Sequence, residues 1–141
     1  MPKGDRCSLL FLAGGFFILL DLVLKQMALL VWTNPIFIFN HIGWAPILNP
    51  GIAFSIQLPN LVIIILTLFI LGFFSYLIAQ TKDKIARLGL TLTIFGAISN
   101  LLDRIFYQNT VDYLQVYISV FNIADILIVT GIGIYLLKLK K

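Results

Sequence analysis

Four long apolar stretches, separated by shorter polar segments, organise the chain. They cover about residues 8–31, 60–79, 86–106 and 119–137. The hydrocarbon core of a bilayer is about 30 Å thick and needs roughly 20 apolar residues per helix, which is close to the length of each stretch. The pattern therefore predicts an all-α membrane protein, a four-transmembrane-helix bundle that forms one integral membrane domain over residues 1–141, without an internal repeat or a linker.

The segment between the first two stretches, about residues 32–59, has a different character. Four prolines interrupt any continuous helix there. Ile36–Phe39 and Ile52–Ile56 are apolar, β-branched or aromatic runs that favour short strands. Trp32 and Trp44 are typical of side chains at the level of the lipid headgroups. We expect a partly ordered cap on the outer face of the bundle.

The composition excludes several classes of protein. Hydrophobic residues make up 60% of the chain and charged residues 11%, against about 45–50% and about 25% in soluble domains. One cysteine, Cys7, allows no intrachain disulfide, and one histidine, His41, allows no histidine-rich metal site. The net charge of +4 comes from scattered basic residues that form no stripe for nucleic acid. We expect no cofactor, no metal and no nucleic-acid partner.

The basic residues predict the orientation in the membrane. Lys3 and Arg6 precede the first apolar stretch, whereas the segment 31–60 has no Lys or Arg. The other clusters lie between the second and third stretches and at the end of the chain: Lys82, Lys84, Arg87, Lys138, Lys140 and Lys141. By the positive-inside rule both termini are cytoplasmic. The N-terminus resembles a secretory signal peptide, but no small-residue cleavage site follows, so we expect a retained helix.

The acidic residues are few, and most of them lie in apolar surroundings. The chain has six aspartates and no glutamate. Asp5 and Asp83 lie among the cytoplasmic basic residues and are expected to be solvated. At about 1.5 Å per helical residue, Asp21, Asp103 and Asp125 all lie roughly 20 Å from the inner face. Acids from three helices are thus predicted to share one level in the outer third of the bilayer, with Asp112 just above them.

Two interpretations of these acids remain open. A charge in hydrocarbon costs on the order of 2.5–3.5 kcal/mol, so it normally faces the bundle interior. Asp21 and Lys25 are spaced as a helical salt bridge, and Asp103 stands beside Arg104, so these four residues can form a network that only holds helices together. A second set, Asp112 and Asp125, has no basic residue within four positions. Two close carboxylates have divergent pKa values and can hydrolyse an amide without a metal.

Three functions are compatible with buried acids in a small membrane protein. The first is a metal-free aspartyl protease that uses Asp112 and Asp125. The second is a small proton-coupled membrane transporter, which predicts carboxylates near the midplane of the bilayer. The third is a lipid-headgroup transferase with aspartates as Mg²⁺ ligands. Motifs of serine hydrolases, P-loop proteins and zinc proteases are absent from the sequence. His41 is expected at the interface, and Cys7 is expected to be inert.

Five short motifs, in order along nearly the whole chain, resemble a known family. They are Asp21-Leu-Val-Leu-Lys25, Asn49-Pro-Gly51-Ile-Ala53-Phe54-Ser55, Gly96-Ala97-Ile-Ser-Asn100-Leu-Leu-Asp103-Arg104, Val111-Asp112-Tyr113 and Phe121-Asn122-Ile-Ala124-Asp125. They resemble the motifs of the bacterial lipoprotein signal peptidases, also called signal peptidase II. Two positions depart from the family pattern. Ser99 stands where glycine is common before the asparagine, and Tyr113 stands where phenylalanine is usual.

The resemblance implies an activity and a site. It implies an aspartyl endopeptidase of the bacterial inner membrane that cleaves diacylglyceryl-modified prolipoproteins before the lipidated cysteine, with the active site near the outer face. The catalytic pair falls on Asp112 and Asp125. The positions implied to support the site or contact substrate are Asp21, Lys25, Asn49, Gly51, Asn100, Asp103, Arg104, Asn122 and Ala124.

The resemblance also implies details of the fold and of the partners. To the four helices it adds a small extracytoplasmic β-cradle and a short interfacial helix. The expected partners are lipid-modified prolipoproteins and membrane phospholipids, and the chain is expected to be a monomer. Small residues such as Gly72, Gly89 and Gly96 would permit close approach of a substrate helix. Asn49, Asn100 and Asn122 would hold the peptide or stabilise an oxyanion.

Overall fold

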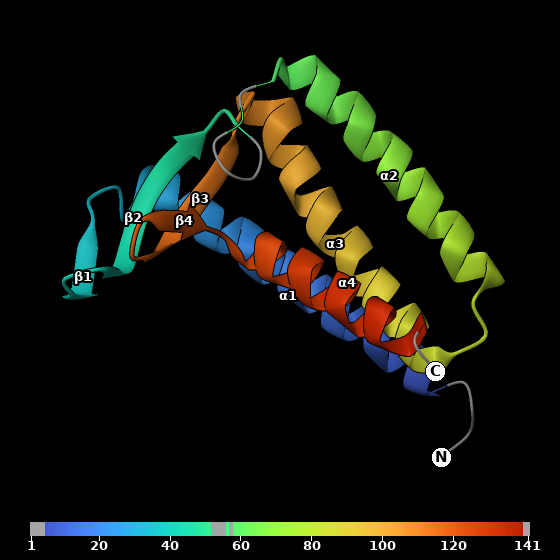
Figure 1. The fold of residues 1–141 in the computed structure, drawn as a ribbon. Coiled ribbons are helices and arrows are strands. Elements are labelled where there is room, and N and C mark those ends of the chain that lie inside the picture. The colour runs from blue at the N-terminus through green and yellow to red at the C-terminus, as the bar shows by residue number, and fades with distance from the viewer. Residues whose placement is uncertain (1–4, 52–55, 57, 140–141) are drawn as a thin grey trace.

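Four helices and one small antiparallel sheet make up the fold (Figure 1). The computed structural model describes residues 5–51, 56 and 58–139. The helices are α1 (Asp5–Leu30), α2 (Asn60–Gln80), α3 (Lys84–Tyr107) and α4 (Ile123–Leu139). The strands are β1 (Ile36–Phe39), β2 (Ile42–Asn49), β3 (Thr110–Val116) and β4 (Ser119–Phe121). α1 begins and α4 ends at one end of the molecule, and the sheet lies at the other (Figure 1).

The sheet has the strand order β1-β2-β3-β4, and every neighbouring pair is antiparallel. The predicted strand at Ile36–Phe39 is confirmed, whereas the one at Ile52–Ile56 falls largely outside the described residues. The β2–β3 register shifts between Trp44 and Ile47, where Pro46 has no N–H for the ladder. Beyond this bulge Ile47 pairs with Asp112, so the end of β2 lies beside Asp112.

One predicted helix begins later than its apolar stretch. The stretch 119–137 was predicted to be helical throughout, but Ser119–Phe121 pairs with β3 and α4 starts at Ile123. Asn122 follows the strand and caps the helix, since its side-chain oxygen accepts the Asp125 N–H at 2.9 Å. The short interfacial helix implied by the resemblance is not among the helices of the described chain.

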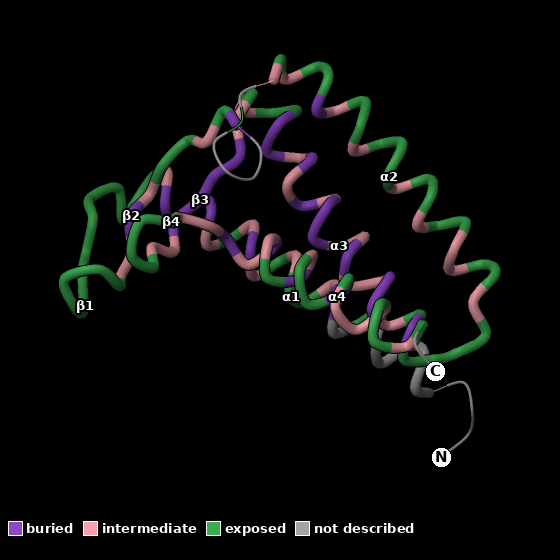
Figure 2. The backbone as a smooth tube through the Cα atoms, in the orientation of Figure 1, coloured by how far each residue is buried: buried purple, intermediate pink, exposed green. Residues whose placement is uncertain are grey.

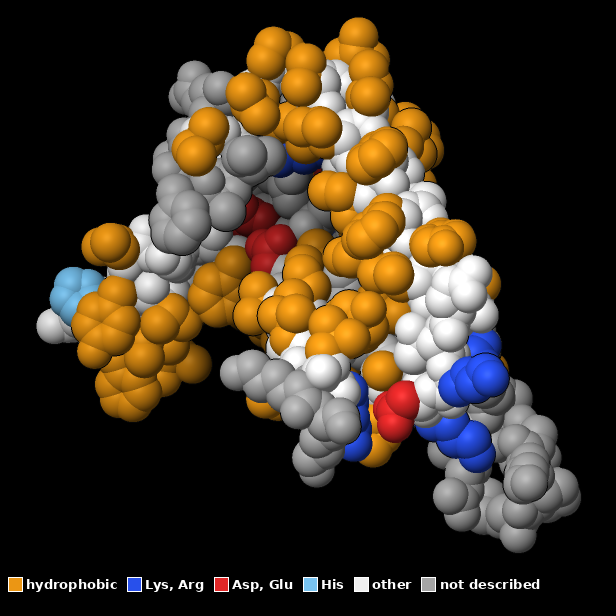
Figure 3. All heavy atoms as spheres, turned by 45° about the vertical axis from the view of Figure 1, so that its right-hand side comes forward, with side chains coloured by type: hydrophobic (Ala, Val, Ile, Leu, Met, Phe, Trp, Pro, Cys, Tyr) orange, Lys and Arg blue, Asp and Glu red, His pale blue; other side chains and the backbone are white. Residues whose placement is uncertain are grey.

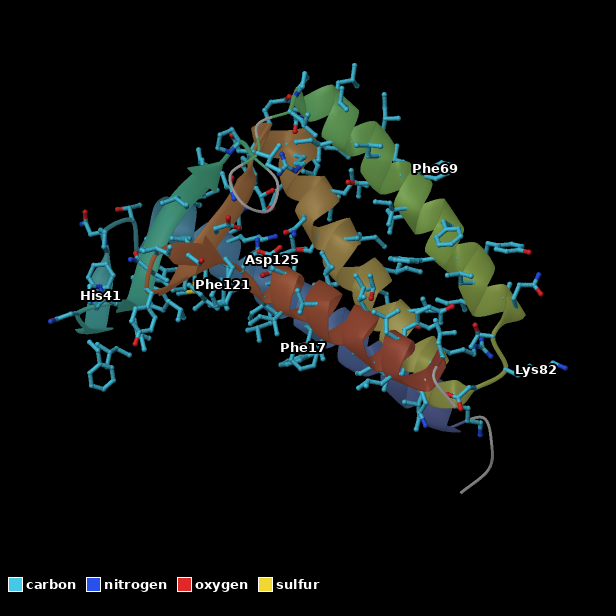
Figure 4. All side chains as sticks on the ribbon, viewed as in Figure 1. Phe17, His41, Phe69, Lys82, Phe121 and Asp125 are labelled. Carbon is cyan, nitrogen blue, oxygen red and sulfur yellow. The ribbon has the colours of Figure 1, made fainter. Side chains whose placement is uncertain are left out.

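The helices differ sharply in how much of their surface is covered (Figure 2). α3 is the central helix and has ten buried residues, whereas α2 has only Ile63. α2 is nevertheless apolar on all sides, with a mean hydropathy of 2.8, and side chains such as Phe69 point away from the molecule (Figure 4). Among the described helices, α2 and α3 are long and apolar enough to cross a membrane. An exposed helix with this composition is typical of a helix in lipid.

Two glycines of α3 let α4 approach closely. A Cβ atom at Gly89 would lie 2.6 Å from the carbonyl oxygen of Gly131, and one at Gly96 would collide with Ala124 in the first turn of α4. Gly72 on α2 has no atom within 4 Å of that position. Gly89 and Gly96 therefore serve helix packing within the chain, and of the three glycines only Gly72 leaves open space.

We predict that Gly89→Val destabilises the protein and that Gly72→Val does not. The added side chain at position 89 forces α3 and α4 apart, which costs about 1–3 kcal/mol, as overpacking usually does. The matched change at position 72 has the same effect on helix propensity but meets no neighbour. Thermal unfolding in detergent should show a lower midpoint only for Gly89→Val; equal midpoints for both variants would contradict the packing described above.

Candidate active site

Asp112 and Asp125 lie on either side of Asn122. The Asp112 carboxylate accepts hydrogen bonds from Asn49 Nδ2 and Asn122 Nδ2, both at 2.8 Å. The Asp125 carboxylate accepts from Asn100 Nδ2 at 2.8 Å and from the Asn122 backbone N–H at 3.2 Å. One asparagine thus donates to both acids. The two carboxylates without a basic neighbour in sequence are therefore brought into one site.

Local sequence explains how each acid is positioned. Asp125 is the third residue of α4, and it exchanges hydrogen bonds with Asn122 in both directions. This is the reciprocal arrangement of a capping box, in which the side chains of the cap residue and of the third helical residue bind each other's backbone N–H. Asp112 lies in the middle of β3, where pairing with β2 holds the backbone. Figure 3 shows acidic side chains at the bottom of a hollow between the sheet end of the molecule and the helices.

The amide of Asn100 is oriented by its other contacts. Its oxygen accepts from Lys25 Nζ at 3.0 Å and from Asn122 Nδ2 at 3.1 Å. Because both neighbours are donors, the NH₂ group must face the remaining acceptor, Asp125. In this structure the amides of Asn49, Asn100 and Asn122 all donate to the two carboxylates, so they hold the acids in place.

Beneath the pair lies a buried network of charged residues. Lys25 Nζ is 2.8 Å from a carboxylate oxygen of Asp21 and 2.8 Å from one of Asp103. The side chains of these three residues are at most 2% exposed. The predicted Asp21–Lys25 salt bridge is thus present. Asp103 also pairs with Lys25, and no salt bridge between Asp103 and Arg104 occurs in the described part of the chain.

This network also joins α1 and α3 to the segments that hold the acids. Asp103 Oδ2 accepts the backbone N–H of Val111, the residue before Asp112, at 3.0 Å. Asp21 Oδ1 accepts the backbone N–H of Ala124, the residue before Asp125, at 3.3 Å. Each network carboxylate therefore holds the neighbour of one acid of the site.

Ser99 and Tyr113 belong to the network, although the sequence reasoning placed neither among the site residues. Ser99 Oγ donates to Asp21 at 2.6 Å and Tyr113 OH donates to it at 2.8 Å. Ser99 Oγ also lies 3.2 Å from Lys25 Nζ, a pairing seen in Ser–Lys hydrolases. Here the serine is fully buried and already donates to Asp21, and Lys25 is bound to two carboxylates. Ser99 is therefore not placed to act as a nucleophile.

The Arg104 guanidinium binds Gly51 through one terminal nitrogen, and its other terminal nitrogen has no hydrogen-bond partner among the described residues. Its Nη2 donates to the Gly51 carbonyl at 2.5 Å, and the Gly51 N–H donates to Asn49 Oδ1 at 2.9 Å. Arg104 Nη1 is buried and has no hydrogen-bond partner among the described residues. A buried guanidinium nitrogen normally has a partner, and an unsatisfied one is a ready donor for an incoming group.

Three other residues singled out in the sequence, Asp83, His41 and Cys7, do not belong to the site around Asp112 and Asp125. Asp83, expected to be a plain solvated charge, accepts the Ala86 N–H at 2.8 Å and caps α3. His41 stacks on Tyr117 at the far end of the sheet, well away from Asp125 (Figure 4). The side chain of Cys7 lies outside the described residues. Within the described chain no group of three or more His, Cys, Asp or Glu side chains is arranged to hold a metal ion.

The surroundings of Asp112 change its acidity. Burial, the larger effect, and the nearby Asp125 raise the pKa of the Asp112 carboxyl to about 7, and the hydrogen bonds from Asn49 and Asn122 oppose this rise. An ordinary aspartate has a pKa of about 3.9. Asp112 is thus able to take up and release a proton near neutral pH, as a member of an acid–base pair must.

We predict that Asp112 makes the stability of the protein depend on pH. Between about pH 4 and about pH 7 the folded state holds the Asp112 proton and the unfolded state does not, so the free energy of unfolding falls as the pH rises through this window. The full shift corresponds to about 4 kcal/mol. Thermal midpoints of Asp112→Asn should fall less between pH 5 and pH 8 than those of the wild type; parallel curves would contradict the raised pKa.

The architecture is similar to that of two bacterial membrane enzymes of known structure. One such enzyme, solved by the in meso method at 2.3 Å resolution, superposes with a TM-score of 0.84 at 22% identity and covers 94% of this chain and 87% of its own. A second, solved at 1.9 Å, has a TM-score of 0.80 at 23% identity and covers 95% and 94%. These likenesses show the fold.

The family follows from the sequence comparisons. Residues 14–141 match the family described as signal peptidase (SPase) II. A lipoprotein signal peptidase of Maridesulfovibrio salexigens is 33% identical over 141 residues, covering 86% of this chain and 90% of its own length. One of Bartonella bacilliformis is 39% identical over 139 residues, covering 88% and 84%. The chain belongs to the signal peptidase II family.

Family membership distinguishes among the three functions that the sequence left open: protease, transporter and lipid-headgroup transferase. The resemblance read from the five motifs is confirmed, and so is the prediction of a protease that removes signal peptides. The proton-coupled transporter has no support among these relatives. A membrane location agrees with the two helices of the described chain that are long and apolar enough to cross a bilayer.

Proposed function

We propose that this chain is an aspartyl endopeptidase that removes the signal peptide from diacylglyceryl-modified prolipoproteins by cleaving before the lipidated cysteine. Asp112 and Asp125 are its catalytic pair. The observation that supports this most directly is that both carboxylates bind the same residue, Asn122. Asp112 accepts from its side-chain amide, and Asp125 accepts from its backbone N–H. The substrate class is supported by the relatives, which are named lipoprotein signal peptidases.

The pair supplies the two proton transfers that amide hydrolysis needs. The ionised carboxylate removes a proton from a water molecule, whose oxygen attacks the carbonyl carbon of the scissile bond. The protonated carboxyl donates its proton to the carbonyl oxygen, giving a neutral tetrahedral intermediate. Collapse of this intermediate breaks the C–N bond. The carboxyl that took a proton from water passes it to the leaving amine, and one hydroxyl of the intermediate returns a proton to the other carboxylate. Asp112, with a pKa of about 7, is the better candidate for the protonated member.

Arg104 is a candidate for binding the substrate backbone. Its Nη1 is buried beside the site without a partner in the described part of the chain, while Nη2 is held by Gly51. A peptide carbonyl near the scissile bond would satisfy this nitrogen. The fork of the guanidinium lets the residue keep its structural contact and bind substrate at the same time.

The proposed topology is four membrane crossings with both termini in the cytoplasm. The loop of Lys82 lies at the end of the molecule where α1 begins and α4 ends, and His41 lies at the opposite end with the sheet (Figure 4). With the basic end inside, the sheet and the catalytic pair lie toward the outer face of the bacterial inner membrane. In this proposed orientation the scissile bond lies near the headgroup region, where a lipidated cysteine is anchored.

The remaining partners follow from the same arrangement. The exposed apolar surface of α2 is proposed to contact membrane phospholipids and the acyl chains of the substrate. The two acids, their asparagines and Arg104 all come from one chain. We therefore propose that a monomer is the active form, because the described site needs no residue from a second copy.

We predict that Asp112→Asn and Asp125→Asn each abolish cleavage of a lipidated precursor while the protein remains folded. An amide neither accepts a proton from water nor donates one to a carbonyl oxygen as a carboxyl does. Loss of one member of an acid–base pair lowers the rate by at least about 10²–10⁴-fold. The measurement is release of signal peptide from a purified precursor in detergent or vesicles.

The matched control for these variants is Asp83→Asn, an exposed aspartate that caps α3 far from the pair. It should cleave like the wild type. The reactions contain EDTA and are run with lipidated and with unlipidated precursor. Undiminished cleavage by either dyad variant, or equal cleavage of the unlipidated precursor, would refute the proposal.

We predict that Arg104→Lys raises KM for the precursor about tenfold with a smaller change in kcat. Lysine keeps the charge but cannot bind Gly51 and a peptide carbonyl with one rigid fork. Loss of binding that is equal in the ground state and the transition state appears mainly in KM. Arg87→Lys, an exposed position on the same helix, is the control; unchanged KM in Arg104→Lys would exclude the substrate contact.

A further inference from the structure

Two hydroxyl groups bind the two oxygens of one carboxylate. Tyr113 OH donates to Asp21 Oδ1 at 2.8 Å and Ser99 Oγ donates to Asp21 Oδ2 at 2.6 Å. All three residues are fully buried. Ser99 and Tyr113 are also the two positions noted above as departures from the pattern of the family. Both departures thus add a hydroxyl, and both hydroxyls meet at the same acid.

The Tyr113 hydroxyl connects the two segments that hold the proposed catalytic acids. Besides donating to Asp21, it accepts the backbone N–H of Ile123 at 3.2 Å. Tyr113 directly follows Asp112 in β3, and Ile123 is the first residue of α4, two positions before Asp125. One hydroxyl therefore sets the start of α4 relative to β3. Burial and the adjacent Asp21 raise the pKa of Tyr113, so its hydroxyl stays protonated and remains a donor.

Ser99 acts on the same acids from α3. Its Oγ accepts from Lys25 Nζ at 3.2 Å while it donates to Asp21. The next residue, Asn100, binds both Lys25 and Asp125. Ser99 thus fixes Asp21 and Lys25 relative to Asn100, the residue that holds Asp125. Ser99 and Asn100 are consecutive residues of α3.

We propose that Tyr113 and Ser99 are positioning residues whose hydroxyls, by binding Asp21, hold β3 and α4 at the separation that the Asp112–Asp125 pair needs. The inference rests on the proposed function, because it assumes that this pair is catalytic. Neither hydroxyl contacts the carboxylates of the pair in the described structure; they act through Asp21, Ile123 and Lys25.

A purely structural role makes a different prediction. The Tyr113 ring packs against Trp44 with ring centroids 4.9 Å apart, and this contact does not involve the hydroxyl. If the two side chains only fill space, phenylalanine at position 113 keeps the function. If the hydroxyls set the spacing of the acids, their removal slows the chemical step, since small displacements of catalytic groups lower rates strongly.

The test compares variants that differ only in a hydroxyl. Tyr113→Phe removes one. Ser99→Thr and Ser99→Val have the same shape, and only threonine keeps the hydroxyl. With lipidated precursor, we expect Tyr113→Phe and Ser99→Val to lower kcat about tenfold with KM within about twofold of the wild type, and Ser99→Thr to retain a kcat close to the wild type.

The two control variants each remove a hydroxyl that does not contact the Asp21–Lys25–Asp103 network. Tyr107→Phe removes a tyrosine hydroxyl that binds Gln26, and Thr93→Val removes a buried hydroxyl of α3 that binds the Gly89 carbonyl. Both should keep the wild-type kcat. A kcat of Tyr113→Phe within twofold of the wild type, or equal losses in Ser99→Thr and Ser99→Val, would overturn the inference. If Tyr113→Phe does not fold, the threonine–valine pair decides alone.

The same series separates this inference from the proposed function. If Asp112→Asn and Asp125→Asn are inactive but Tyr113→Phe and Ser99→Val are not slowed, the catalytic pair stands and the positioning role is wrong. If either dyad variant cleaves normally, the proposed function is wrong, and the positioning role that depends on it is wrong as well.

Discussion

The buried ammonium of Lys25 is the contact on which the rest of the site depends. Charges removed from water carry a large desolvation cost, so they persist in an interior only with close partners of opposite sign and further hydrogen bonds. Lys25 has both. Carboxylate oxygens of Asp21 and Asp103 each lie 2.8 Å from its Nζ, and Ser99 Oγ and Asn100 Oδ1 accept hydrogen bonds from it. These partners come from α1 and α3, and Asp21 extends the network to β3 and α4. One cation thus determines how three helices and the sheet meet.

The aspartates of the structure divide by the kind of donor that holds them. Asp21 and Asp103 bind the Lys25 ammonium directly. Asp112 and Asp125 bind amide and backbone N–H groups, which are neutral. The hydrogen bonds from these neutral donors fix the geometry of the Asp112 carboxylate and oppose the effect of burial only in part, so the pKa of Asp112 is raised to about 7. Asp21 and Asp103 therefore belong to a structural ion network around Lys25, whereas the asparagines hold Asp112 and Asp125 as a pair that is able to exchange protons.

Particular residues show how far the sequence predicts this arrangement. The lengths of the apolar stretches located α1, α2 and α3, but the same criterion placed the start of α4 too early, because a short apolar strand such as Ser119–Phe121 has no periodicity that separates it from a helix. The β2–β3 pairing was not predicted, since it joins residues far apart in the chain. Ser99 and Tyr113 were noted only as departures from a motif; their contacts with Asp21 span 78 and 92 positions.

The sequence by itself determined that the protein belongs in a membrane, because 60% hydrophobic residues leave too few polar side chains to cover a soluble domain. It also identified the motifs from which the family was inferred, since these are short and local. The tertiary structure alone decided that Asp103 pairs with Lys25 rather than with Arg104, and that asparagines hold Asp112 and Asp125. The physical reason is that the acidity of a carboxylate depends on burial and on donors within a few ångströms. Here those donors come from α1, β2, α3 and the Asn122 cap that precedes α4.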